Sequence, residues 1–529
     1  MLLVRVWWIV ALTTLLLSTL SDELSAATLQ GEIRDSDSGQ LLPARLYIQS
    51  ADGAKWFFAK SADAMGAALI YDRGSDQKSV EKHTTLSAHP FVAELPPGKY
   101  TLTVERGKEY LTAAQEVEVA DKPVSVTIKL KRWINMAERG WYSGDTHVHR
   151  PIGELSNVVL AEDLNMIYPM SQWVTVAHTL PEKGRVDPQQ IPTAPIFADP
   201  THAIVPLNTE YEIFSVGEKR HTLGAVLILG QKEPLKIGIP PLKAVAEEAH
   251  RQGGLLDLEK HSWAWTPIIA PVMKADLYPL SNNHVWRTEF AFKSWTLENN
   301  WSDNPRIETN KEGFTELGWL HFGWEQYYAM LNCGLRMRPT AGTANGVHPV
   351  PAGFSRVYVD LGDNKFTPEL WQKRLNEGRS FVTTGPLIEW SVDRGANVVS
   401  IRHRIHTQSR HVRVETLVSG EIKNVAEWKQ LGDGIPISGS SEFGGLESGW
   451  IAIRCFEYRP DGRILFAHTA PVYWDAPGNT LRPRRDQVRY LIQRCEEEIA
   501  RNKDVLSEVE LDEYREALNF YRGKLETAR

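Results

Sequence analysis

The stretch Gly144-Asp145-Thr146-His147-Val148-His149 carries two histidines two positions apart. In an extended chain, side chains at positions i and i+2 leave the same face, so His147 and His149 lie close enough to bind one metal ion. Shortly before this stretch, at Trp141, short apolar runs begin to alternate with helical patterns. This alternation is typical of an α/β unit with parallel strands, and it continues to about Leu387.

One helix-and-strand unit of this region is especially clear. A helical stripe comes first, formed by Leu242, Val245, Ala246 and Ala249. The glycines at 253 and 254 end the helix, and a buried strand follows over residues 255–258. We expect this strand to deliver His261 to the end of the sheet.

The other histidines of the region also gather where apolar runs begin or end. Of the 16 histidines, ten lie between residues 141 and 387. His178 follows the run 173–177, Glu210 follows the run 203–207, and His221 precedes the run 223–229. In a parallel α/β barrel the carboxyl ends of the strands meet at one mouth, so these side chains are expected to converge. A mixture of imidazole nitrogens and carboxylate oxygens favours Zn, Mn or Fe over Ca or Mg.

The region resembles the PHP (polymerase and histidinol phosphatase) superfamily of metal-dependent hydrolases, and within it the CehA/McbA type. Residues 145–149 match the family's D-x-H-x-H motif, and residues 378–386 resemble the segment that closes the domain. The resemblance implies a distorted β/α (PHP-type) barrel over residues 141–388. The positions that match ligand motifs of the family are His147, His149, His178, Glu210, His221 and His261. Glu210 competes with Glu212 on the same strand face, and the match favours Glu210.

Two positions depart from the family's motifs. Ala177 precedes His178 where the family has Asp, and Ala344 stands where the family has a metal-binding Asp. Only His348 lies nearby as a substitute. We therefore expect one or two ions per chain, Zn or Mn first and Fe next, in a mononuclear or rearranged binuclear site.

The expected chemistry is hydrolysis by metal-activated water, acting on an ester, amide, carbamate or phosphoester bond. His178 and His221 serve as further ligands or as the proton donor, and Asp145 orients an imidazole or ligates directly. Arg338 and Arg379 either hold an anionic group of the substrate or are solvated surface residues. The rival hypothesis is a non-catalytic extracytoplasmic binding protein with a degenerate site. Within the hydrolase class, a phosphatase is a further alternative.

The first residues have the pattern of a secretory signal. Arg5 precedes an apolar stretch over residues 6–17, and Ser25 with Ala27 fits the small-x-small cleavage rule. We expect cleavage after Ala27, with an uncleaved anchor as the alternative, and an exported protein that is periplasmic or extracellular. No later stretch has the 18 or more uninterrupted apolar residues of a spanning helix, so no integral membrane span is expected after cleavage.

Two regions with period-two alternation flank the α/β unit. Residues 28–132 predict a small antiparallel β-sandwich, and residues 94–102 resemble the carboxypeptidase regulatory-like domains, which are usually non-catalytic. Residues 389–477 predict a second β-sandwich. The tail, residues 478–529, predicts a helical hairpin from two apolar stripes.

Composition narrows the functional classes. The 529 residues allow several domains, and the net charge of −7 provides no basic excess for binding nucleic acid. The three cysteines lie far apart, which excludes a disulfide scaffold and an all-cysteine zinc site. The substrate is expected to be a small molecule, or derived from a glycan or peptide. Trp263, Trp265 and Trp286 line either a substrate cleft or the core.

Overall fold

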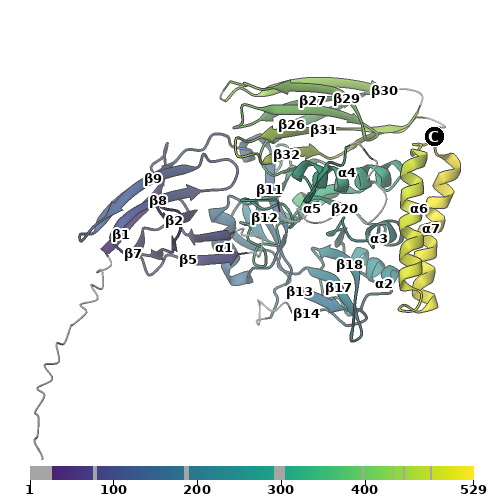
Figure 1. Ribbon diagram of the computed structural model, residues 1–529, viewed down its shortest axis with the longest axis horizontal. Coiled ribbons are helices and arrows are strands. Elements are labelled where there is room, and N and C mark those ends of the chain that lie inside the picture. The colour runs from purple at the N-terminus through teal and green to yellow at the C-terminus, as the bar shows by residue number, and fades with distance from the viewer. Residues whose placement is uncertain are drawn as a thin grey trace, which may run out of the picture.

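The computed structural model describes residues 27–74, 80–183, 190–290, 304, 306–395, 398–432, 434–444, 447–476 and 479–529. The expected signal, apart from Ala27, lies outside these residues. Figure 1 shows an N-terminal β-lobe at one end, an α/β region in the middle, C-terminal strands along one side and a helical hairpin at the other end.

The N-terminal lobe contains two sheets that share one core. Their orders are β10-β1-β7-β4 and β5-β6-β2-β8-β9, with β3 paired to β2. The strands are β1 (Ala27–Asp35), β2 (Ala44–Ser50), β3 (Trp56–Phe57), β4 (Lys60–Ser61), β5 (Ala68–Gly74), β6 (Val80–Leu86), β7 (Phe91–Leu95), β8 (Gly98–Glu105), β9 (Ala113–Val119) and β10 (Val124–Leu130). The alternating residues Leu29, Leu46 and Leu102 are fully buried between the sheets.

The prediction of an all-antiparallel sandwich is wrong at one pair. β1 and β10 run parallel, with Leu29 opposite Val124. The rest of the lobe separates these two strands in the chain, and a long connection of this kind is what parallel pairing needs.

The α/β region begins with a short 3-10 helix at Ala137–Arg139. Its strands are β11 (Trp141–Val148), β12 (Met166–Pro169), β13 (Gln172–Val176), β14 (Glu182–Lys183), β15 (Ile196–Asp199), β16 (His202–Ile204), β17 (Thr209–Val216), β18 (Lys219–Leu229), β19 (Leu255–Asp257), β20 (Leu277–Ser281), β21 (Thr309–Asn310), β22 (Gly313–Phe314), β23 (Arg338–Ala341), β24 (Arg356–Asp360) and β25 (Ser380–Thr383). Its helices are α1 (Ile152–Ala161), α2 (Leu242–Arg251), α3 (Thr266–Val272), α4 (Glu316–Asn332) and α5 (Pro368–Asn376). The predicted unit is confirmed: α2 buries the four residues of the predicted stripe, and β19 follows.

The strands of this region lie in two sheets, and the described residues form no closed barrel. One sheet has the order β14-β13-β17-β18-β19-β20-β23, while β15, β16, β12, β11, β24 and β25 belong to another. The pairs β17–β18 and β24–β25 are antiparallel. A tight turn at Gly217, with φ of 58°, joins β17 to β18, and without a crossover helix the two strands cannot run parallel.

The two sheets meet at two places beside the histidine stretch. The chain passes from β12 directly to β13, and the amide of Met170 donates to the carbonyl of Val148 at 2.8 Å. At the second place, the segment after β23 bonds to the end of β11: Ala344 N donates to His147 O at 2.7 Å, and His149 N to Asn345 O at 2.6 Å. The carboxyl end of β11 therefore lies between the sheets.

The C-terminal strands form two sheets over one core, as the predicted second β-sandwich requires, and one of these sheets also continues the sheet of β11. β32 pairs with β25, and the sheet continues through β31 and β28 to β29. The expected boundary at residue 389 falls inside β26. The strands are β26 (Leu387–Arg394), β27 (Val398–His406), β28 (Val412–Val418), β29 (Glu421–Trp428), β30 (Ile437–Gly444), β31 (Gly449–Tyr458), β32 (Ile464–Thr469) and β33 (Val472–Trp474). The separate sheet β26-β27-β30 shares a core with these strands.

The predicted helical hairpin is confirmed. Helices α6 (Arg485–Asn502) and α7 (Glu508–Thr527) lie side by side (Figure 1), and Ser507 with Glu510 forms a capping box at the start of α7. Tyr521 of α7 is buried and donates to the carbonyl of Pro267 in α3 at 3.0 Å. The hairpin is thereby attached to the α/β region.

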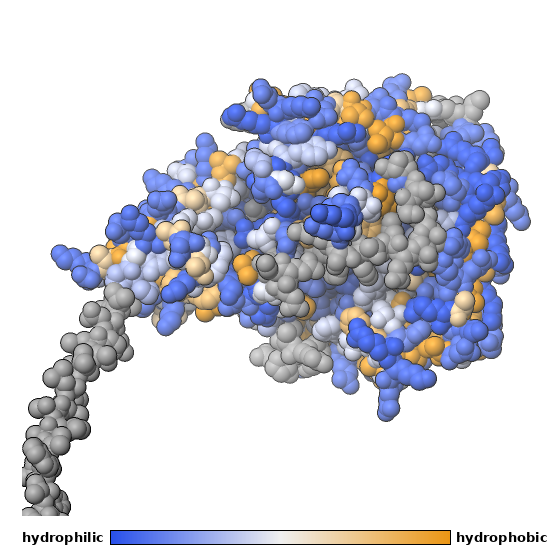
Figure 2. Space-filling model, viewed as in Figure 1, coloured by the Kyte–Doolittle hydropathy of each residue, from blue (hydrophilic) through white to orange (hydrophobic). Residues whose placement is uncertain are grey.

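Three further features of the described chain are the polarity of one face, the state of the cysteines and the hydropathy of the helices. On the face shown in Figure 2, hydrophilic side chains predominate over the helical hairpin, and apolar side chains form small separate groups. All three cysteines are buried and free. Within the described parts of the chain, none of the helices combines the length and the apolar character needed to cross a membrane.

Candidate metal centre

The two histidines of the 144–149 stretch face the same point. His147 is the last residue but one of β11 and His149 follows the strand directly, and both side chains are buried. Their Nε2 atoms lie 3.0 Å apart. The i and i+2 spacing therefore produces the predicted pair.

Glu210, at the start of β17, completes a group of three. Its Oε2 atom lies 3.1 Å from Nε2 of His149 and 3.5 Å from Nε2 of His147. One ligand atom from each residue falls within 4.8 Å of the others, so a single metal ion can reach all three. Among the described residues, this is the one such group of His, Cys, Asp or Glu. We call His147, His149 and Glu210 the metal trio.

The chemistry of the metal trio fits a cation. Both carboxylate oxygens of Glu210 are buried without an acceptable hydrogen bond. Such buried unsatisfied groups are rare in native proteins, and an ion is one of the partners that satisfies them. Imidazole nitrogens with a carboxylate oxygen form a ligand set suited to Zn, Mn or Fe.

Glu259 is a residue in contact with the metal trio that sequence reasoning missed. Its Oε1 atom lies 3.0 Å from Nδ1 of His147, on the side of the ring away from the metal trio. Lys260 Nζ lies 3.6 Å from Glu259 and 3.4 Å from Glu212. A signal was present: Asp257 and Glu259 are spaced i and i+2 at the end of the strand that leads to His261.

Burial and neighbouring charges shift the pKa values of the side chains in and around the metal trio. Burial lowers the pKa of His147, but Glu259 and Glu210 together outweigh burial and raise it to about 10. Burial lowers the pKa of His149. Burial also raises the pKa of Glu212 to about 7 and that of Asp257 to about 8. Without a metal, His147 is therefore protonated at neutral pH.

The carboxylate of Asp145 accepts its hydrogen bonds from backbone amides and a hydroxyl, and not from an imidazole ring. Its Oδ1 atom accepts from the amides of His147 and Thr343, both at 3.1 Å. Its Oδ2 atom accepts from the Thr343 hydroxyl at 2.6 Å and from the Gly353 amide at 2.8 Å. Burial raises the pKa of Asp145 to about 6, although the Thr343 hydrogen bonds act in the opposite direction. The predicted contact with an imidazole is absent, because other groups occupy both oxygens.

His261 is buried outside the metal trio. Its ring lies 5.3 Å from that of Trp319, and its Nδ1 atom lies 3.3 Å from the side-chain nitrogen of Asn282. Burial lowers the pKa of His261 to about 3, so the ring is neutral. The chain turns after β19, and this turn directs His261 toward helix α4, where a Cβ at Gly323 would be 2.9 Å from its Nε2 atom.

His178 and His221 lie against the C-terminal helices. His178 Nε2 is 2.6 Å from Glu510, and His221 Nε2 is 2.8 Å from the Asn502 side-chain oxygen. For His221 the reason is strand direction: β18 runs antiparallel to β17, and Leu227 is the residue opposite Glu210. His221 is six residues before Leu227, about 20 Å along the strand. The predicted roles of both histidines at the centre do not match these positions.

Ala344, one of the two positions that depart from the family's motifs, lies in a loop after β23 that is hydrogen-bonded to the N-terminal lobe. Ala344 is buried with a φ of 49°, and no carboxylate replaces it there. His348 contacts the side-chain nitrogen of Asn283 at 2.9 Å. The Tyr71 hydroxyl, from the β5–β6 hairpin, donates to His348 O at 2.6 Å and accepts from Gly346 N at 2.8 Å. The second departure, Ala177, is a buried core residue.

The remaining candidates also have definite positions. Trp265 and Trp286 are buried and Trp263 is half-buried. Arg338 begins β23, and Arg379 lies directly before β25 and pairs with Asp360. Both arginines are at the opposite end of the strands from the metal trio.

Comparisons with protein-family models, with curated proteins and with solved structures gave no match for this chain.

Proposed function

We propose that the chain is an exported metal-dependent hydrolase that cleaves an ester, amide, carbamate or phosphoester bond with metal-activated water. The observation that carries this proposal is the buried metal trio, with its ligand atoms within 4.8 Å of one another. Three protein ligands that leave a further coordination position open are typical of catalytic zinc sites, whereas structural sites are closed by four. Zn or Mn, one ion per chain, suits these ligands best.

The resemblance to the PHP superfamily supports the same conclusion. Of the positions that match its ligand motifs, His147, His149 and Glu210 meet in space, whereas His178, His221 and His261 lie outside this group. We propose that the two sheets of the α/β region are an opened form of the PHP-type barrel. Export rests on the signal-like pattern of residues 1–27.

The residues around the metal trio have complementary roles in this proposal. A bound ion would lower the pKa of water toward about 7 and polarise the carbonyl or phosphoryl oxygen of the substrate. Glu259 holds the proton on Nδ1 of His147, which leaves Nε2 free to face the metal trio. The carboxyl of Glu212, with a pKa raised to about 7 by burial, is suited to proton transfer near neutral pH.

A second candidate function is a non-catalytic metal-binding protein. The observation that favours it is Ala344, which is buried beside the end of β11 and supplies no carboxylate. A chain with one metal ligand set and no turnover would fit this alternative. The two candidates predict the same metal content and differ in activity.

The test is elemental analysis of the purified mature protein, combined with assays on carboxyl-ester, amide and phosphoester substrates. Wild type is compared with His147→Ala/His149→Ala and with the nearly isosteric Glu210→Gln. The hydrolase proposal expects about one equivalent of Zn or Mn in the wild type, with metal and turnover both lost in the variants. Competition by inorganic phosphate identifies the phosphatase alternative.

A matched control removes two histidines elsewhere. His406 and His411 lie in the C-terminal lobe and pair with Glu389 and Glu427. Their double alanine variant should keep both metal and activity. Metal without turnover on any substrate would favour the binding protein, and a wild type without metal would overturn the site itself.

A further inference from the structure

A cavity of about 640 Å³ lies at the end of the α/β strands opposite to the metal trio. Trp141, the first residue of β11, lines it, and His147 is six residues further along, about 20 Å away. The C-terminal lobe provides the other wall through β26 and β33. The cavity is therefore a second, separate site between the two parts of the chain.

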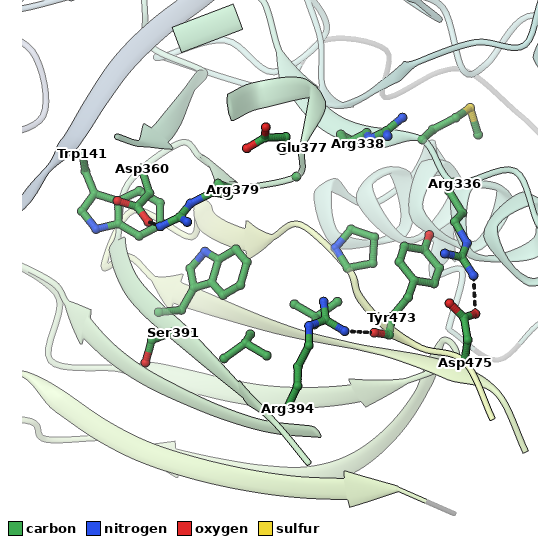
Figure 3. A pocket seen from close by; sticks show the side chains of 16 residues that line it. Trp141, Arg336, Arg338, Asp360, Glu377, Arg379, Ser391, Arg394, Tyr473 and Asp475 are labelled. Atoms are coloured by element: carbon green, nitrogen blue, oxygen red, sulfur yellow. Dashed lines mark hydrogen bonds and ion pairs between the residues drawn. The ribbon is translucent and has the colours of Figure 1, made fainter. Parts of the chain in front are cut away.

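Four arginines line the cavity from different elements. Figure 3 shows their guanidinium groups on different sides of the same space. They are Arg336, Arg338, Arg379 and Arg394. Arg336 and Arg338 come from the segment before β23 and from β23 itself, while Arg379 directly precedes β25 and Arg394 ends β26, so the fold brings together two separate parts of the sequence.

Carboxylates neutralise only part of this charge. Asp475 pairs with Arg336, and Asp360 pairs with Arg379 (Figure 3). The third lining carboxylate, Glu377, is 2.8 Å from Arg374, which does not line the cavity.

Two arginines are left without a carboxylate partner among the described residues. Arg338 has no side-chain partner there, and Arg394 donates only to the backbone carbonyl of Tyr473. The cavity thus contains an excess of guanidinium groups over the carboxylates that are free to balance them.

Neutral donors in the wall lack acceptors as well. Nε1 of Trp390 and the hydroxyl of Tyr473 are buried without a hydrogen bond within the described chain. Burial raises the pKa of Tyr473, so its hydroxyl keeps its proton. Buried donors of this kind are normally satisfied.

We propose that this cavity binds a small organic anion through a carboxylate or phosphate group. Guanidinium groups bind both oxyanions in bidentate geometry, and Arg338 and Arg394 are available for it. The rings of Trp141 and Trp390, with centroids 6.4 Å apart, offer apolar contacts to the body of the ligand. The volume is within the usual range for small-molecule sites.

The test is isothermal titration calorimetry of the full protein with two probes, inorganic phosphate and succinate. Saturable binding of one or both probes is expected, and the stronger probe distinguishes phosphate from carboxylate recognition. Arg338→Gln and Arg394→Gln should each raise the Kd at least tenfold. Arg394 is exposed, so its variant is expected to fold even if Arg338→Gln does not.

The control is Arg402→Gln, on the neighbouring strand β27. Arg402 is exposed, pairs with Asp393 and does not line the cavity. Its variant should bind both probes as the wild type does. Absence of saturable binding at millimolar concentrations, or equal weakening by Arg402→Gln and Arg394→Gln, would overturn the proposal.

Discussion

The carboxylate of Glu259 lies 3.0 Å from Nδ1 of His147, on the side of the imidazole opposite to Glu210 and His149. A carboxylate in this position fixes the tautomer and orientation of a metal-binding histidine and increases its basicity. Glu259 would therefore act on a bound metal ion through His147.

Replacement of Glu259 by Gln should weaken metal binding by about 10- to 100-fold, because the amide cannot hold the Nδ1 proton as strongly. Competition with a chromogenic chelator measures the change. Glu248→Gln is the control, since Glu248 lies on the exposed side of α2 and pairs with Arg251. Unchanged affinity in Glu259→Gln would show that the contact has no influence on the metal.

Metal affinity should increase with pH. The pKa of His147 is about 10 in the metal-free protein, so a metal must displace a proton from its ring at neutral pH. Protons compete with the metal below this pKa, and raising the pH removes the competitor. We expect the association constant to rise roughly tenfold per unit between about pH 6 and pH 9.

Chelator competition across this pH range gives the slope. Glu259→Gln removes one of the two charges that raise the pKa of His147, so its slope should be shallower than that of the wild type. A flat profile in the wild type would mean that the ligands are already deprotonated.

Gly342 should not tolerate a methyl group. A Cβ at this position would lie 2.4 Å from Cβ of His147, so Gly342→Ala must displace β11 or the segment after β23. We expect a loss of about 1–3 kcal/mol in the free energy of unfolding, together with weaker metal binding. Denaturant titration and metal analysis test both.

Gly153 provides the matched control. It lies in helix α1, and a Cβ there would meet nothing within 4 Å. Gly153→Ala should stabilise the protein by about 0.5–1 kcal/mol because alanine favours the helix. Equal effects of the two substitutions would contradict the close approach at His147.

Tyr71→Phe should loosen the loop that follows β23. The lost hydroxyl bridges His348 O and Gly346 N, so the variant leaves a backbone donor without its partner. The expected cost is about 1–2 kcal/mol of unfolding free energy, measured by denaturant titration. Tyr458→Phe is the control, since the Tyr458 hydroxyl has no hydrogen bond with the described residues, and the two variants should differ clearly.

Elements that depend on a local pattern could be predicted from the sequence, whereas strand pairings that depend on the path of the chain could not. Period-two and helical stripes located β1, β10, α2 and the C-terminal hairpin, because each pattern depends only on neighbouring residues. The parallel pairing of β1 with β10 depends on the path of the whole lobe, which no short window contains. The same applies to the sheet that continues from β25 into β32.

In the candidate site as well, local spacing predicted some positions, whereas others depended on the path of the chain. His147 and His149 followed from their spacing, whereas placing His221 required the direction of its strand, and placing His178 required the position of helix α7. β18 runs back along β17 and carries His221 away from Glu210. Glu259 could have been predicted from the sequence, because Asp257 and Glu259 have the same i and i+2 spacing at the end of β19.

The pairing of β25 with β32 has a mechanical consequence. Removing or unfolding the C-terminal strands would leave the backbone groups of Ser380 and Thr384 unpaired at a bare sheet edge, which invites aggregation. The α/β region and the C-terminal strands should therefore melt in one cooperative transition by calorimetry. A truncation at residue 388 should yield insoluble protein, because the C-terminal strands complete the hydrogen bonding of the sheet that contains β11, the strand of His147.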